Sequence, residues 1–147
     1  MGSSDELAAG PAIARTIGLA ASLAVLTARV AGRADLAERA RSLQRQARPL
    51  VEADAAAYSD YLRTRSEEDR VRTIDLPLQM AALAAQTAEV AAEAAEAAQG
   101  AVGGDARVGA LLAEAAARAA AVLVRMNGGG DAAEGSSARA ARAAARV

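Results

Sequence analysis

Residues 105–126 read DARVGALLAEAAARAAAVLVRM, and this stretch decides the fold. Alanine fills nine of the 22 positions, and alanine is the best helix former because it loses no side-chain entropy on folding. An apolar stripe recurs at helical spacing: Val108, Leu111, Leu112, Ala115, Ala119, Val122 and Met126. The pattern predicts an amphipathic helix that begins at Asp105, ends at Asn127 before Gly128, and packs this stripe inward.

The same composition extends over the whole chain of 147 residues, of which 53% are hydrophobic. Tyr58 and Tyr61 are the only aromatic residues, and the β-branched residues that favour strands do not cluster. Length and composition therefore predict one all-α domain, an antiparallel bundle of about five long, Ala-rich helices.

Glycine, proline and capping residues set the expected helix boundaries. The first helix should begin at Asp5, with Ser4 or Asp5 as its cap. The expected helices are Asp5–Ala31, Ala34–Arg63 with a kink or break at Pro49, Ser66–Gln99 with a kink at Pro77, Asp105–Asn127, and a C-terminal helix within 131–147. Residues 1–130 form the predicted bundle, and the Ala/Arg-rich segment 131–147 is expected to pack weakly because it lacks large apolar side chains.

The first helix has two apolar stripes instead of one. They are Ile13, Ile17, Ala20 and Ala24, and then Leu19, Leu23, Leu26 and Val30. Two stripes predict a helix at the centre of the bundle or at an interface. A core of alanine removes little apolar area from water, so we expect a homodimer, most simply a twofold one.

Composition also limits the classes of function. The net charge of −1 gives no basic surface for nucleic acid. The longest uncharged run, Thr16 to Ala28, has 13 residues, fewer than the roughly 20 that span a membrane. The chain has no cysteine and no histidine, so thiol chemistry is excluded, the usual general base is missing, and we expect no metal and no cofactor. The acidic start, Met1 to Glu6, is unlike a signal peptide and predicts a cytoplasmic protein.

Several polar residues are candidates for a site, each with a structural alternative. Asp54 and Tyr58 are four residues apart on one helix face, so they can present a carboxylate and a phenol to one cleft; a solvated Asp and a space-filling Tyr would have the same spacing. Asp105 could be an acid or base, or only a helix cap. Asn127 could bind a ligand amide, or only end its helix.

Arginines give the second predicted helix a basic face, formed by Arg39, Arg41, Arg45 and Arg48. This face could bind a polyglutamate tail or another anion. A solvated face balanced by Glu89, Glu93 and Glu96 explains the same residues without a ligand.

Three segments resemble the cyclodeaminase/cyclohydrolase family, which includes formimidotetrahydrofolate cyclodeaminase and methenyltetrahydrofolate cyclohydrolase. They are Glu52–Tyr58, Leu76-Pro77-Leu78, and the helix from Asp105-Ala106 to Val124-Arg125-Met126-Asn127, in the family's order. The resemblance implies an antiparallel helical bundle that dimerises. It also implies folate one-carbon chemistry without a metal or redox cofactor: closing a formimino group to methenyl with loss of ammonia, or hydrolysing methenyl to formyl.

The resemblance also assigns candidate roles. Asp105, Asp54 and Tyr58 would carry protons, and Asn127 would hold a folate-like small molecule. Arg15 and Arg107 are further candidates for substrate binding. Arg15 ends the stretch that replaces the family's glycine-rich turn, and Arg107 stands where the family has a single glycine after Asp-Ala.

The departures from the family pattern keep a second function open. Gly10-Pro11-Ala12-Ile13-Ala14-Arg15 replaces the family's glycine-rich turn, Gly32–Asp35 is short, and Leu123 stands where the family has an asparagine. The first hypothesis is a divergent enzyme that acts on a C–N bond of an amidine or iminium-type substrate. The alternative is a non-catalytic homodimer or small-molecule binder that kept the fold and lost the folate site; a membrane-surface bundle is a third.

Overall fold

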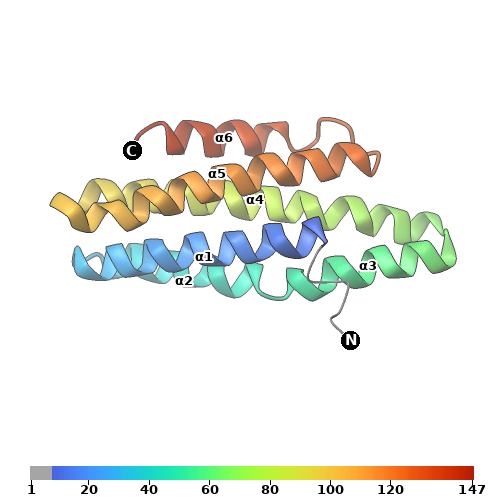
Figure 1. The fold of residues 1–147 in the computed structure, drawn as a ribbon, viewed down its shortest axis with the longest axis horizontal. Helices are drawn as coiled ribbons and strands as arrows, with labels where there is room; N and C mark the ends of the chain where they lie inside the picture. Colours follow the sequence, from blue (N-terminus) through green and yellow to red (C-terminus); the bar gives the residue numbers. More distant parts are fainter. Residues whose placement is uncertain (1–7) are drawn as a thin grey trace.

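The computed structural model describes residues 8–147, and within them it contains six α-helices and one short 3-10 helix. These are α1 (Ala9–Val30), α2 (Ala34–Ala47), α3 (Leu50–Thr64), α4 (Glu67–Ala97), η2 (Gly100–Val102), α5 (Gly103–Met126) and α6 (Glu134–Ala144). The helices run lengthwise beside one another in an antiparallel bundle (Figure 1). The predicted all-α class is therefore confirmed.

Local chemistry explains most of the boundaries. Pro49 separates α2 from α3, so the long helix predicted there is two helices. Ser66 caps α4 as predicted, since its Oγ accepts the backbone N–H of Asp69 at 3.1 Å. Pro77 lies inside α4 without ending it. The first helix begins at Ala9 after an extended Ala8; the predicted caps Ser4 and Asp5, and the acidic start, lie outside the described residues.

Alanine makes up most of the core between α1, α4 and α5. Ile17, Met80 and Val124 are among its largest buried side chains. The helices approach closely: a Cβ atom at Gly109 of α5 would lie 3.0 Å from the backbone oxygen of Ala20 in α1. Small residues allow this spacing, because no side chain stands between the backbones.

The predicted inward stripe of α5 is wrong. Leu111 is 55% exposed and Met126 is 75% exposed, and Val108 and Val122 are also exposed. The buried face of α5 consists instead of small residues and one valine: Ala106, Gly109, Ala110, Ala113, Ala116, Ala117, Ala120, Ala121 and Val124. Small residues on this face let the helix backbones pack closely, whereas leucines there would hold the helices apart.

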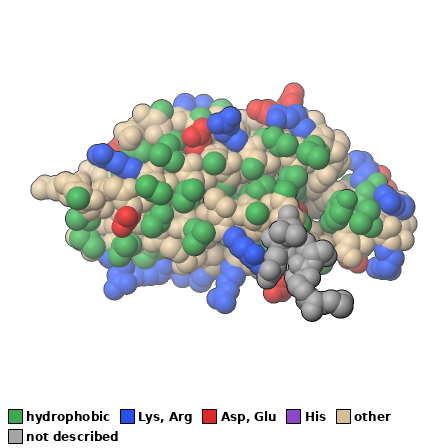
Figure 2. Space-filling view, in the orientation of Figure 1, with side chains coloured by type: hydrophobic (Ala, Val, Ile, Leu, Met, Phe, Trp, Pro, Cys, Tyr) green, Lys and Arg blue, Asp and Glu red, His purple; other side chains and the backbone are tan. Residues whose placement is uncertain are grey.

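Three of the four residues in the second stripe of α1 are exposed as well. Leu19 is 63% exposed, and Leu26 and Val30 are more than half exposed, whereas Ile13 and Ile17 of the first stripe are buried. Figure 2 shows hydrophobic side chains spread over the face that α1 and α5 present together. We call this set the α1/α5 face: Leu19, Leu26 and Val30 from α1, and Val108, Leu111, Val122 and Met126 from α5.

The C-terminal helix α6 packs on α4 and α5. Ala140 and Ala143 belong to the same apolar core as the rest of the bundle. Two ion pairs join α6 to α4: Arg139 lies 2.8 Å from Glu89, and Arg146 lies 2.7 Å from Glu96. A third pair, Arg39–Glu93 at 2.7 Å, joins α2 to α4.

Within the described part of the chain, α1 alone is long and apolar enough to cross a membrane by length and composition. This is weak evidence, because a core helix of a bundle passes the same test, and α1 packs against α2, α4 and α5 here.

Candidate functional site

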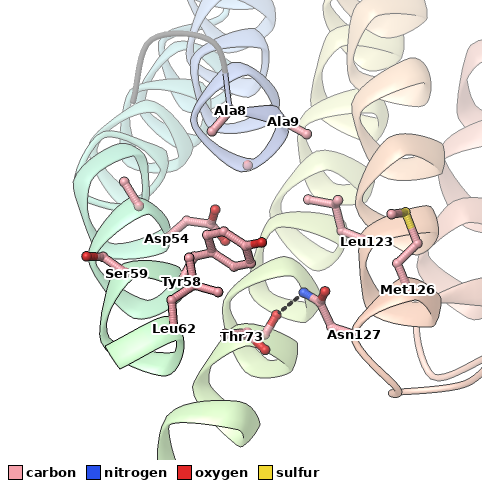
Figure 3. Close-up of a pocket in the computed structure, with 12 residues that line it drawn as sticks. Ala8, Ala9, Asp54, Tyr58, Ser59, Leu62, Thr73, Leu123, Met126 and Asn127 are labelled. Carbon is pink, nitrogen blue, oxygen red and sulfur yellow. Dashed lines mark hydrogen bonds between the residues drawn. The ribbon is translucent and has the colours of Figure 1, made fainter. Parts of the chain in front are cut away.

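A pocket of about 510 Å³ opens at one end of the bundle, where α1 begins and α5 ends (Figure 3). Its walls come from four helices and the residue before α1: Ala8, Ala9, Gly10, Asp54, Ala55, Tyr58, Ser59, Leu62, Thr73, Leu123, Met126 and Asn127. Apolar side chains supply most of the surface, and a few polar groups converge on it, which is the usual character of a small-molecule site.

Asp54 on α3 meets α1 at Gly10. A Cβ atom at residue 10 would lie 1.8 Å from Oδ2 of Asp54, so the carboxyl group occupies the space that any other side chain would fill. The side chain is half-buried, and this burial raises the pKa of Asp54 above its ordinary value. The carboxyl can therefore exchange a proton closer to neutral pH than a solvated aspartate can.

Tyr58 follows Asp54 by one turn of α3, on the same side of the helix. Its ring extends into the space between Asp54 and the end of α5 (Figure 3). The residue is more than half exposed, so the ring forms an accessible wall of the pocket and is not filler in the core.

Asn127 ends α5 and also lines the pocket. The backbone N–H of Gly129 donates to the carbonyl of Val124 at 2.8 Å, and that of Gly128 to Arg125 at 3.1 Å, which is the Schellman pattern of a helix end. The side chain of Asn127 donates from Nδ2 to the carbonyl oxygen of Thr73 in α4 at 2.7 Å. Asn127 therefore both ends α5 and lines the pocket.

Three of the six candidate residues thus meet in one pocket, and Asp105 does not join them. It lies at the opposite end of α5 from Asn127, about 33 Å away at 1.5 Å per residue. Asp105 is also not the cap of α5: the 3-10 helix runs straight into α5 at Gly103, which leaves Asp105 exposed in the first helical turn. Arg107 is exposed at the same end.

Arg15 lines a separate groove of about 520 Å³ between α1 and the junction of α2 with α3. Arg45 and Arg48 line the same groove. The structure therefore places Arg15 away from Asp54, Tyr58 and Asn127.

Sequence reasoning missed several residues of the pocket. The sequence identifies Gly10 only as part of the stretch that replaces the family's glycine-rich turn, and Leu123 only as a departure from the family's asparagine. Thr73 had a detectable signal, because it stands four residues before Pro77 and so has a carbonyl without a helical donor. In residues 8–147 no group of three or more acidic side chains is placed to hold a metal ion.

A family model described as Formiminotransferase-cyclodeaminase matches residues 8–145. The chain belongs to this family. The resemblance inferred from the sequence is thereby confirmed, and it covers α6 as well as the first five helices. A search of curated proteins found no match to the chain. The formiminotransferase-cyclodeaminase match and the pocket are independent observations, and both concern the same bundle.

Proposed function

We propose that this cyclodeaminase-family protein is an enzyme that acts on a C–N bond of an amidine or iminium-type substrate, with a tetrahydrofolate one-carbon derivative as the first candidate. The observation that carries the proposal is the half-buried carboxyl of Asp54, seated against Gly10 in an open pocket with Tyr58 and Asn127. Family membership supplies the reaction class, and the pocket supplies groups able to move protons.

The proposed chemistry needs a group that both takes and gives a proton. In hydrolysis of a methenyl group, water attacks the iminium carbon and loses a proton to the Asp54 carboxylate. The carboxyl then returns the proton to the ring nitrogen as the C–N bond breaks. The hydroxyl of the intermediate becomes the formyl carbonyl, and its proton passes to the Asp54 carboxylate and then to solvent. In cyclodeamination the neighbouring amine nitrogen of the folate attacks the formimino carbon and loses its proton to the Asp54 carboxylate. The carboxyl gives a proton to the amino group of the intermediate, and the C–N bond to that group breaks to release ammonia.

The raised pKa of Asp54 suits this exchange, because general acid–base catalysis is most effective when the pKa of the group lies near the working pH. The Tyr58 hydroxyl is a second group that can donate a hydrogen bond or a proton in the same pocket.

The alternative, a protein that kept the fold and lost the site, predicts that Ala12–Arg15 continues the first helix and fills the cleft. These residues are helical. The pocket nevertheless stays open beside Ala8, Ala9 and Gly10. The open pocket argues against a cleft filled by the first helix, and turnover separates the enzyme from a small-molecule binder.

Purified protein assayed with methenyltetrahydrofolate and with formiminotetrahydrofolate tests the proposal. We expect turnover of at least one compound and a loss of about 10²- to 10⁴-fold in Asp54→Asn, the usual range for an acid or base. Asp75→Asn, which changes an exposed carboxylate of α4 outside the pocket, is the matched control and should keep full activity. Absence of both turnover and binding would overturn the folate assignment.

We also propose that the working form is a homodimer joined through the α1/α5 face. Leu19, Leu26 and Val30 belong to the second stripe of α1, which also contains Leu23, and its members are alternately four and three residues apart. Apolar residues at this spacing are typical of helices that pack against other helices. The face is roughly 33 Å long and 20 Å wide from the length of α1 and two helix diameters. An area near 650 Å² is close to the roughly 800 Å² per partner of a stable interface.

A second copy on this face would also reach the pocket. Met126 belongs to both: it is the most exposed member of the α1/α5 face and it lines the pocket. The partner would therefore cover the mouth of the pocket, shield Asp54 from solvent, and make the site complete only in the dimer.

A further inference from the structure

Pro77 leaves one carbonyl of α4 without its helical partner. In an α-helix the carbonyl of residue i accepts the N–H of residue i+4, and proline has no N–H. Thr73 stands four residues before Pro77, inside α4. Its backbone oxygen therefore needs a donor from elsewhere, and the residue is buried.

Asn127 supplies that donor from the end of α5. Its Nδ2 lies 2.7 Å from the Thr73 oxygen, across 54 residues of sequence (Figure 3). A carbonyl oxygen can only accept, so the amide nitrogen of Asn127 must face α4 and the amide oxygen must face away from it. Among residues 8–147 no group donates to this Oδ1.

The consequence concerns the pocket that Asn127 lines. A freely turning asparagine amide could present either its donor or its acceptor to a ligand. With one N–H of Nδ2 held by Thr73, the amide cannot flip, so the acceptor Oδ1 keeps one fixed position beside the pocket. Burying such an acceptor against a ligand that lacks a donor leaves the oxygen unpaired, which is the strongest form of discrimination by hydrogen bonding.

We propose that Pro77 is a positioning residue: it frees the Thr73 carbonyl, which fixes the amide of Asn127 so that the pocket selects ligands that offer an N–H donor at this point. The ligand class is therefore an amide, amidine or amino-heterocycle with a free N–H. This inference rests on the proposed function, since it requires that the pocket bind the substrate.

Pro77→Ala tests the inference, because it supplies a helical N–H that bonds to the Thr73 carbonyl and competes with Asn127 for it. The first readout needs no ligand. In the wild-type protein, NMR should show one slowly exchanging proton on the Asn127 side-chain amide, and in Pro77→Ala this protection should be lost while the fold is retained. Rapid exchange of both protons in the wild type, or retained protection in the variant, would overturn the inference.

The second readout is ligand preference. Binding is measured for methenyltetrahydrofolate and for its analogue methylated at the ring lactam N–H. We expect the wild type to prefer the unmethylated compound by about tenfold or more, the range of a good hydrogen bond, and Pro77→Ala to lose most of that preference. An unchanged preference in Pro77→Ala would overturn the inference.

Asn127→Ala completes a double-mutant cycle. On the Asn127→Ala background, Pro77→Ala should have no further effect on the preference; an additional effect would mean that Pro77 acts by another route and would overturn the inference. If the wild type binds neither compound, the proposed function and the ligand class fail together, while the amide-proton readout still decides whether Pro77 fixes Asn127.

Discussion

Gly10 and Asp54 are matched to one another: the carboxyl of Asp54 stands where a side chain at residue 10 would begin, with Oδ2 1.8 Å from the position of a Cβ atom. Gly10 lies in the first turn of α1 and Asp54 in α3, so the contact joins the start of one helix to the middle of another. The glycine gives the carboxyl its space, and it also suits a helical residue before Pro11, where a Cβ atom would crowd the proline ring.

Gly10→Ala should separate activity from stability. The methyl group would push the Asp54 carboxyl aside, which its side-chain rotation allows, so activity should fall about tenfold or more if Asp54 carries protons. Stability should change by less than about 1 kcal/mol, because the higher helix propensity of alanine is offset by crowding of its Cβ atom against the Pro11 ring. Turnover and thermal unfolding are the two measurements.

Gly18→Ala is the matched control for that substitution. Gly18 is also in α1, and a Cβ atom there meets nothing within 4 Å. It should gain the same helix propensity and keep full activity. Equal activity in Gly10→Ala and Gly18→Ala would show that the position of the Asp54 carboxyl is unimportant.

Asp54 should make stability depend on pH. Because burial raises the pKa of Asp54, the folded protein holds this proton more tightly than the unfolded chain does. As pH rises from about 4, the usual aspartate pKa, through the folded value, the unfolded chain loses its proton first and the free energy of unfolding falls. This loss is complete above the folded pKa.

Asp54→Asn removes the ionisation. The free energy of unfolding of Asp54→Asn minus that of the wild type should therefore be larger at pH 7 than at pH 3. Urea unfolding of both proteins at each pH measures this difference. Asp75→Asn, an exposed site, should show a smaller pH dependence of this difference. A difference between Asp54→Asn and wild type that does not change with pH would contradict the assignment of a raised pKa.

The α1/α5 face should control the oligomeric state. Leu26→Glu or Leu111→Glu places a charge in the proposed interface, where it would be desolvated, so sedimentation should show a change from dimer to monomer and activity should fall with it. Val71→Glu, at another exposed apolar position on α4, should leave the dimer intact.

Three outcomes would contradict the proposed interface. They are a wild-type protein that is monomeric at micromolar concentration, dimers that survive both substitutions, and a monomer that binds lipid vesicles through this face.

Gly109 should be intolerant of larger side chains. A Cβ atom there would lie 3.0 Å from the Ala20 oxygen and 3.4 Å from Cβ of Leu23, so Gly109→Val should cost about 1–3 kcal/mol in denaturant unfolding, the range for overpacking. Gly104→Val is the control, since Gly104 is in the same helix and meets nothing within 4 Å. Similar losses in both would mean that valine propensity, and not the helix contact, causes the effect.

Most of the helices could be predicted from the sequence. Alanine content, the break at Pro49 and the cap at Ser66 are local properties, and the helices follow them. Part of the candidate site could also be predicted, because the spacing of Asp54 and Tyr58 puts them on one helix face and Asn127 stands at a predicted helix end. Only the structure shows that Asn127 lies beside the other two.

The sequence by itself determined that the chain is helical, where most helices break, and that α1 and α5 each carry a stripe of large apolar residues, because helix periodicity depends only on neighbours within a few turns. Only the tertiary structure decided which face of each helix is buried. The alanine face of α5 lies inside because it lets three backbones approach closely, and its leucines are left on the surface. The tertiary structure also placed Asp54 and Tyr58 at the Asn127 end of α5, away from Asp105, because helix packing decides which helix ends meet. It brought Gly10, Thr73 and Asn127 together from helices far apart in the sequence.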